Sequence, residues 1–169
     1  EIDPTDLLLQ EFVPGVEFGV FYVREPGEPR GQILSVNGKE LLQLVGDGER
    51  RLEQLILEDD RAVRQAEVHF EYHAERLYEV PAAGEVVDLV EVGAHARGTL
   101  FLDRRDLASE ALLARLDEIA GAFPDFHFGR FDLRVPDEDA LREGRELRIL
   151  ELNGMTAEVA HIYDPRNSL

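Results

Sequence analysis

The 169-residue chain contains no cysteine, so it can form neither disulfide bonds nor metal sites built from thiolates. Basic residues are scarce: 18 lysines and arginines face 36 aspartates and glutamates, which gives a formal charge of −18. Such a chain would meet nucleic-acid phosphates mainly with carboxylates, which argues against non-specific DNA or RNA binding. No apolar run approaches the roughly 20 residues that cross a bilayer, and no signal peptide opens the chain. These absences predict a cytoplasmic protein that neither enters a membrane nor binds nucleic acid.

The chain does have enough apolar material for a core. Its hydrophobic share is 44%, and a length of 169 residues suffices for one domain. The first residue is Glu1 rather than methionine, and the end at residues 164–169 reads as an interruption. We therefore expect residues 1–169 to be one piece of a longer protein.

The first third of the chain favours β-structure. Residues 16–23 are rich in aromatic and β-branched residues, which is typical of a strand. Asn37-Gly38 is a strong hairpin signal, and apolar residues flank it at 32–36 and 40–45. The sequence thus predicts an antiparallel meander of these three segments.

Further along the chain, apolar residues at helical spacing alternate with strand-like segments. The predicted elements are helices over 49–58, 59–77 and 106–122, and strands over 86–92, 99–102, 128–135 and 147–152. Strands and helices in this order are typical of an α+β fold. We expect helices to cover one face of a mostly antiparallel sheet.

Two of the expected strands carry polar residues at alternate positions. Because side chains alternate between the faces of a strand, Arg130 and Asp132 share one face, as do Glu151 and Asn153. If the two strands pair, Asp132, Glu151 and Asn153 converge on one patch. Carboxylate and amide oxygens of this kind suit Mg²⁺. A solvated sheet face would show the same alternation, so the pattern alone leaves both interpretations open.

Three blocks of sequence resemble ATP-grasp ligases. The block GRFD at 129–132, followed by ELNG at 151–154, is similar to the motif of D-alanine–D-alanine ligases and their relatives. The block QEFVPGVEF at 10–18 is similar to the hinge that carries the adenine in that family. The block VGDG at 45–48, ahead of LEQLI at 52–56, resembles a segment of cyanophycin-synthetase-like ligases. The blocks occur in the family's order, and the resemblance covers nearly the whole chain.

This resemblance implies the C-terminal part of an ATP-grasp fold, with the missing N-terminal half on the same chain. It implies an enzyme that uses ATP and Mg²⁺, with Mn²⁺ as an alternative ion, to join a small carboxylate to an amine through an acyl phosphate. The 169 residues alone are expected to be inactive. A degenerate module that binds nucleotide or a partner protein without catalysis is the alternative. The resemblance names neither substrate, and it leaves the oligomeric state open, a homodimer included.

The resemblance also implies roles for single residues. Asp132, Glu151 and Asn153 would hold two Mg²⁺ ions between them. Arg130, aided by Arg97, would steady the acyl phosphate and the tetrahedral intermediate.

The nucleotide contacts come from the hinge block. Gln10, Phe12 and Val13 would line the adenine site, and Glu17 would hold the ribose. Lys39 is the only lysine of the chain. It has two interpretations, a solvated residue of the predicted hairpin turn or a cation that reaches the γ-phosphate.

Several histidines carry two interpretations each. His95 lies with Arg97 in a loop of small residues that either approaches a ligand or is an ordinary surface loop. His161 either faces the acceptor substrate or packs against the fold. His69 and His73 are spaced as a helical metal pair, but their acidic neighbours favour a solvated helix face.

Overall fold

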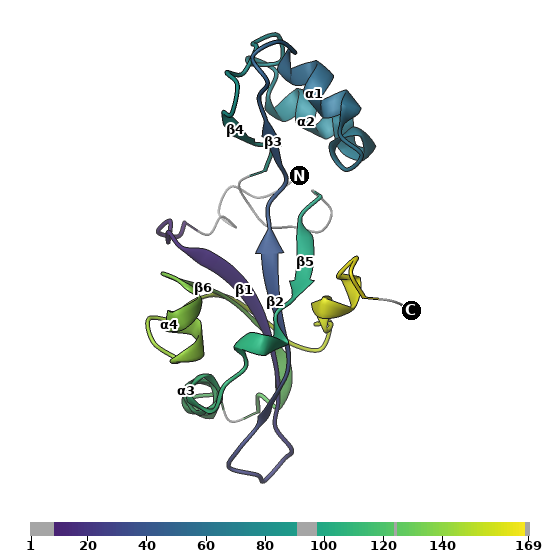
Figure 1. The fold of residues 1–169 in the computed structure, drawn as a ribbon. Coiled ribbons are helices and arrows are strands. Elements are labelled where there is room, and N and C mark those ends of the chain that lie inside the picture. The colour runs from purple at the N-terminus through teal and green to yellow at the C-terminus, as the bar shows by residue number, and fades with distance from the viewer. Residues whose placement is uncertain (1–8, 91–97, 124, 168–169) are drawn as a thin grey trace.

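The computed structural model describes residues 9–90, 98–123 and 125–167, and its main feature is a five-stranded sheet. Across the sheet the strands are β5 (Leu100–Asp103), β2 (Gln32–Glu40), β1 (Val16–Val23), β6 (Phe128–Val135) and β7 (Arg148–Asn153). Every neighbouring pair is antiparallel. Strands β2, β1 and β6 therefore form the interior of the sheet, as Figure 1 shows.

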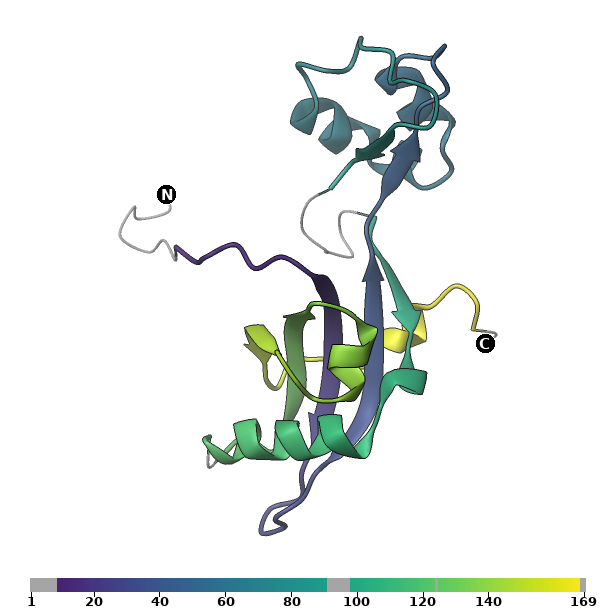
Figure 2. The same cartoon turned by 60° about the vertical axis from the view of Figure 1, so that its left-hand side comes forward.

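One face of this sheet is apolar and is covered by two helices. Phe18, Val20 and Tyr22 alternate along β1 and are buried against the helices. The helices are α3 (Glu110–Gly121) and α4 (Glu138–Arg142). Figures 1 and 2 show both on the same side of the sheet. The main core of the protein lies between these two layers.

Helix α3 is fixed at its start and along its buried side. The Ser109 hydroxyl accepts a hydrogen bond from the Leu112 amide at 3.0 Å, which caps the first turn. Leu112 and Leu116, one helical turn apart, are fully buried. The Tyr22 hydroxyl of β1 donates to Asp117 of α3 at 2.7 Å. Burial and this hydrogen bond raise the pKa of Tyr22 to about 12.

A smaller unit stands beyond one end of β2, at the top of Figure 1. It contains β3 (Gln43–Val45), β4 (Val86–Asp88), α1 (Leu52–Glu58), α2 (Ala66–Tyr72) and the 3-10 helix η2 (Ala62–Gln65). Strands β3 and β4 pair as a separate two-stranded sheet. This unit has its own apolar cluster, which includes Leu42, Leu44, Leu52, Leu55, Ile56, Val87 and Leu89. The molecule thus has two cores, one in each unit.

The expected fold class is confirmed: helices cover one face of a mostly antiparallel sheet. The predicted strands at 16–23 and 128–135 match β1 and β6 at both ends. The strand predicted over 147–152 is β7, shifted by one residue. Among the described helices, none is both long and apolar enough to cross a membrane.

The hairpin predicted at Asn37-Gly38 is wrong, because β2 runs straight through both residues. Asn37 pairs with Gly19 of β1 on one side and with Asp103 of β5 on the other. The turn type that favours Asn-Gly needs a positive φ at both central residues, and neither residue has one. Pairing on both sides of β2 therefore overrides the local turn preference.

The helix boundaries also differ from the prediction. One helix is expected over 59–77, but the structure has the two short helices η2 and α2, and residues 73–78 form turns. The Asp59 side chain accepts a hydrogen bond from the Ala62 amide at 2.8 Å, just before η2. The helix expected from residue 106 begins at Glu110, because Ser109 caps it. The strand expected over 86–92 ends at Asp88 within the described residues.

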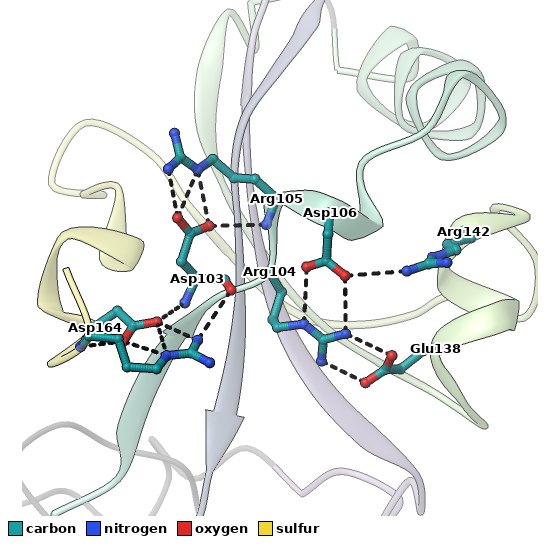
Figure 3. A network of polar contacts seen from close by, with 8 residues as sticks. Asp103, Arg104, Arg105, Asp106, Glu138, Arg142 and Asp164 are labelled. Carbon is teal, nitrogen blue, oxygen red and sulfur yellow. Dashed lines mark hydrogen bonds and ion pairs between the residues drawn. The ribbon is translucent and has the colours of Figure 1, made fainter.

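The C-terminal segment lies on the other side of the sheet from α3 and α4 (Figure 1). It contains the 3-10 helix η5 (Ala160–Tyr163) and then Asp164, which is buried. The Asp164 carboxylate accepts from the Asp103 amide at 2.7 Å and pairs with Arg166 at 2.6 Å. Figure 3 shows this anchor, which holds the segment against strand β5.

A second cluster in Figure 3 is formed by Arg104, which joins the 3-10 helix η4 (Arg105–Leu107) to helix α4. Its guanidinium binds both oxygens of Glu138, at 2.6 and 2.7 Å. Its Nε donates to Asp106 at 3.1 Å, and Asp106 also accepts from Arg142 at 3.2 Å. These side chains are partly solvated, so each pair stabilises the fold only slightly.

Candidate functional site

The sheet face opposite α3 and α4 carries polar residues. The strand register aligns five residues in one row across it: Asp103, Asn37, Gly19, Asp132 and Glu151. Directly paired residues of antiparallel strands point to the same face, with Cβ atoms roughly 5 Å apart. Gly19 has no side chain, so the middle of the row is free for the side chains of its neighbours. This row is the centre of the candidate site.

Asp132 has polar partners on several sides. Arg130 donates from Nε to Oδ1 at 2.9 Å and from Nη2 to Oδ2 at 3.1 Å. Asn153, the cross-strand partner of Arg130, donates from Nδ2 to Oδ2 at 3.1 Å. The Nζ atom of Lys39 lies 3.8 Å from Oδ1. Because the Asp132 side chain is only 7% exposed, these charges interact more strongly than they would in water.

Lys39 connects Asp132 to a second buried carboxylate. Its Nζ lies 2.5 Å from Oε1 of Glu17, and the Lys39 side chain is 6% exposed. The other oxygen of Glu17 accepts from Nη2 of Arg134 at 3.1 Å. The residues Arg134, Glu17, Lys39, Asp132 and Arg130 thus alternate in charge, and we call them the charge network. Because positive and negative side chains alternate, each charge in the network lies beside one of opposite sign. A charge that is largely removed from water needs such a partner.

The donor set beside the charge network fits Mg²⁺. Asp132 and Glu151 are cross-strand partners, and the Asn153 amide contacts Asp132. Glu151 is exposed, so an ion can reach it from solvent. Mg²⁺ is usually held by one or two carboxylates, with phosphate oxygens and water in the remaining positions. Among the described residues no three of His, Cys, Asp and Glu gather as a metal-binding group.

The hinge segment ahead of β1 lies against Arg134. Its Nη1 donates to the Val13 carbonyl at 2.6 Å, and its guanidinium lies over the Phe12 ring, 5.2 Å from the centroid. Phe12 is otherwise 76% exposed, and Gln10 is exposed as well. A hollow of about 560 Å³ opens here, lined by Phe12, Pro14, Gly15, Leu41, Asp88, Val90 and Arg134. An exposed aromatic ring beside such a hollow offers a surface on which a flat base can stack.

The structure brings six of the twelve predicted site residues onto one face. Those on it are Glu17, Lys39, Arg130, Asp132, Glu151 and Asn153. Lys39 is not a solvated turn residue, because β2 continues through it and its side chain is buried. His95 and Arg97 lie outside the described residues.

The remaining histidines have structural contacts. His161 places Nδ1 2.7 Å from the hydroxyl of Ser35 on β2, which brings its ring to the polar face. The solvated helix face expected for His69 is wrong, because α2 turns this residue inward and leaves it 1% exposed. Desolvation, with a smaller effect of the neighbouring His73 charge, lowers the pKa of His69. His73 contacts the Leu89 carbonyl through Nε2 at 3.2 Å.

Asn37 and Gly19 are site residues that sequence reasoning missed. Asn37 is 1% exposed, and both its Oδ1 and its Nδ2 are buried without a partner. A Cβ added to Gly19 would stand 2.5 Å from Oδ1 of Asn37 and 3.0 Å from Cδ of Arg130. The absent side chain therefore lets Asn37 and Arg130 approach each other over the centre of the sheet. Alternation along residues 16–23 does put Glu17 and Gly19 on one face, but the hairpin prediction hid Asn37.

Comparison with known proteins supports the fold. No protein-family model and no curated protein matches the chain. Among solved structures, the chain is similar to a bifunctional glutathione synthetase from Pasteurella multocida, with 17% sequence identity and a TM-score of 0.54. The match covers 90% of this chain and 22% of that chain. The chain therefore shares the fold of one part of that glutathione synthetase.

That likeness concerns the fold. The chain spans about a fifth of the length of the glutathione synthetase it matches, whose substrates are properties of that larger protein.

Proposed function

We propose that this chain carries the metal- and nucleotide-binding part of an ATP-grasp ligase that activates a carboxylate as an acyl phosphate for attack by an amine. The observation that carries the proposal is the row on the polar face. There the cross-strand pair Asp132 and Glu151, with Asn153 beside it, adjoins the partly buried cations Lys39 and Arg130. Oxygen donors for a divalent ion next to cations for phosphate oxygens are what a metal–nucleotide complex requires.

The reaction explains why both kinds of group are needed. A carboxylate oxygen is a poor leaving group. Transfer of the γ-phosphoryl group of ATP to that oxygen forms an acyl phosphate and releases ADP. The amine nitrogen then attacks the carbonyl carbon, the C–O bond to phosphate breaks, and the amide, inorganic phosphate and a proton are released. When bound, Mg²⁺ neutralises charge on the phosphate oxygens in the transition state.

The residues of this chain supply binding and orientation. Asp132, Glu151 and Asn153 would hold the ion, and Lys39 would add positive charge at the phosphates. Arg130 would bind the acyl phosphate once it is formed. Cations already placed where charge develops lower the barrier without further rearrangement of solvent.

The nucleotide would extend from this row toward the hinge. Phe12 lines the hollow that suits the adenine ring, and Gln10 lies two residues before it. Val13 lines a second hollow, of about 310 Å³, which shares Phe12 with the first. Glu17, between hinge and row, would accept from the ribose hydroxyls. In the present state its two oxygens face Lys39 and Arg134, so ribose binding would share or replace those contacts.

We further propose that catalysis requires segments beyond these 169 residues. The match to only 22% of the glutathione synthetase chain supports this view. The isolated chain would then bind Mg²⁺–ATP weakly and form no product.

The test is to trap the acyl phosphate made by the full-length protein. Hydroxylamine converts an acyl phosphate to a hydroxamate, so mixtures of small carboxylates are incubated with Mg²⁺–ATP and hydroxylamine, and ADP and hydroxamate are measured together. Asp132→Asn and Glu151→Gln should each lower both rates at least about a hundredfold, as expected for removing charge stabilisation from a transition state. Glu118→Gln is the control, because Glu118 is exposed on α3 and, within the described part of the chain, pairs with Arg115 alone.

Two results would contradict the proposal. Wild-type rates in both the Asp132 and the Glu151 variants would show that neither residue holds a required ion. Mg²⁺–ATP binding without any carboxylate-dependent ADP release would favour a nucleotide-binding module without catalysis.

A further inference from the structure

Asn37 stands out on an otherwise paired polar face. Among the described residues it is the one side chain with two separate polar atoms that are buried without a partner. Its side chain is 1% exposed. Burying an amide without hydrogen bonds costs free energy, so such a group calls for an explanation.

Arg130 is a cation whose side chain approaches the same point of the sheet as Asn37. Oδ1 of Asn37 and Cδ of Arg130 lie 2.5 and 3.0 Å from the same point above Gly19, one reaching it from β2 and the other from β6. Lys39, the next residue on this face of β2, is already held by Glu17 at 2.5 Å. Arg130 is therefore a donor that a change of side-chain rotamer can bring to Asn37.

Arg130 also occupies the place that an ion would need. Its Nε and Nη2 contact both oxygens of Asp132. A divalent cation at Asp132 would compete for those oxygens and repel the guanidinium. The Arg130 side chain is only 18% exposed, so once displaced it needs another acceptor on this face. The carbonyl oxygen of Asn37 is such an acceptor.

We propose that Asn37 is a positioning residue that receives Arg130 when a divalent cation occupies Asp132. Without the cation, Arg130 pairs with Asp132 and the Asn37 amide has no partner. With the cation, Arg130 leaves Asp132 and donates to Oδ1 of Asn37, which frees the carboxylate and keeps the guanidinium on the polar face. The inference rests on the proposed cation site, and it assigns to Asn37 a part in setting the affinity of that site.

The test is a double-mutant cycle that measures the affinity of the chain for Mn²⁺–ADP, with free Mn²⁺ followed by electron paramagnetic resonance. Asn37→Leu removes the receiving oxygen, so it should weaken Mn²⁺–ADP binding about tenfold, as expected for the loss of a hydrogen bond to a charged group. Arg130→Met removes both the cation that competes for Asp132 and a positive charge near the phosphates, and it is the background in which Asn37 is tested. In the Arg130→Met background, Asn37→Leu should have no further effect, because no guanidinium remains to be received.

A second measurement follows Arg130 directly and does not depend on the size of the affinity change. The Nε–H resonance of Arg130, assigned from its loss in Arg130→Met, should shift on addition of Mg²⁺–ADP. Asn37→Ala serves if Asn37→Leu fails to fold, because Ala fills less space than Leu. In Asn37→Ala, the shift of the Arg130 resonance should be smaller than in the parent and should differ from it in direction.

The outcomes separate the inference from the proposed function. Equal weakening by Asn37→Leu in both backgrounds, or none in either, would overturn the role of Asn37. An Arg130 resonance that shifts alike in the parent and in Asn37→Ala would do the same. Asp132→Asn is the reference: if it binds Mn²⁺–ADP as well as the parent, the cation site itself fails, and with it the inference.

Discussion

Lys39→Met is the substitution whose effect on stability follows most directly from the charge network. The change removes the ammonium that lies 2.5 Å from Glu17 and 3.8 Å from Asp132 while keeping the apolar stem. The two carboxylate side chains are 13% and 7% exposed, so water cannot replace the lost cation fully. Breaking a buried ion pair costs roughly 3–5 kcal/mol. Because Glu17 keeps Arg134 and Asp132 keeps Arg130, we expect the lower end, about 3 kcal/mol of the free energy of unfolding.

Urea unfolding followed by circular dichroism measures this loss, and two further variants locate its cause. Glu17→Gln removes one of the two charges that Lys39 compensates. Lys39→Met should then cost about 1–2 kcal/mol less in that background. Arg115→Met, which breaks an exposed pair with Glu118, should change stability by less than about 0.5 kcal/mol. If Lys39→Met costs no more than Arg115→Met, the charge network does not stabilise the fold as argued.

Two other predictions concern the sheet centre and the core. Gly19→Ala places a Cβ 2.5 Å from Oδ1 of Asn37, so it should lower the free energy of unfolding by about 1–3 kcal/mol. Gly121→Ala is the control and should not lower it, because its Cβ meets nothing within 4 Å. Equal melting temperatures of the two variants would contradict the packing argument. The pKa of Tyr22 is about 12 in the folded protein, whereas that of an unfolded tyrosine is near 10.0. Between these two pH values the folded state binds more protons than the unfolded state, so the free energy of unfolding should fall as the pH rises. Tyr22→Phe should remove that part of the pH dependence in urea titrations, and an unchanged slope would show that Tyr22 is not its source.

The part of the site on β6 and β7 could be predicted because its signals are local. Alternation along each strand decides which residues share a face, and the pairing of the two strands brings Asp132 beside Glu151. The strands at 16–23 and 128–135 were predicted at their full length for the same reason.

The part on β2 could not be predicted, because its structure depends on distant strands. Asn37-Gly38 is a turn signal by itself, and only pairing with β1 and β5 keeps it extended. That error also supported the solvated interpretation of Lys39, although its ammonium lies between the carboxylates of Glu17 and Asp132. Alternation likewise puts Arg130 and Asp132 on one face, but it does not show that the guanidinium folds back onto the carboxylate.

The central claim is that the polar face binds a metal–nucleotide complex through Asp132. Calorimetric titration of Mg²⁺–ATP into the full-length protein tests this directly, with the Asp132→Asn and the distant Glu118→Gln variants beside it. We predict saturable binding to the parent and to Glu118→Gln that is lost when the metal is chelated, and at least about tenfold weaker binding to Asp132→Asn. Binding that is indifferent to both the metal and Asp132, or no binding by the parent, would contradict the claim.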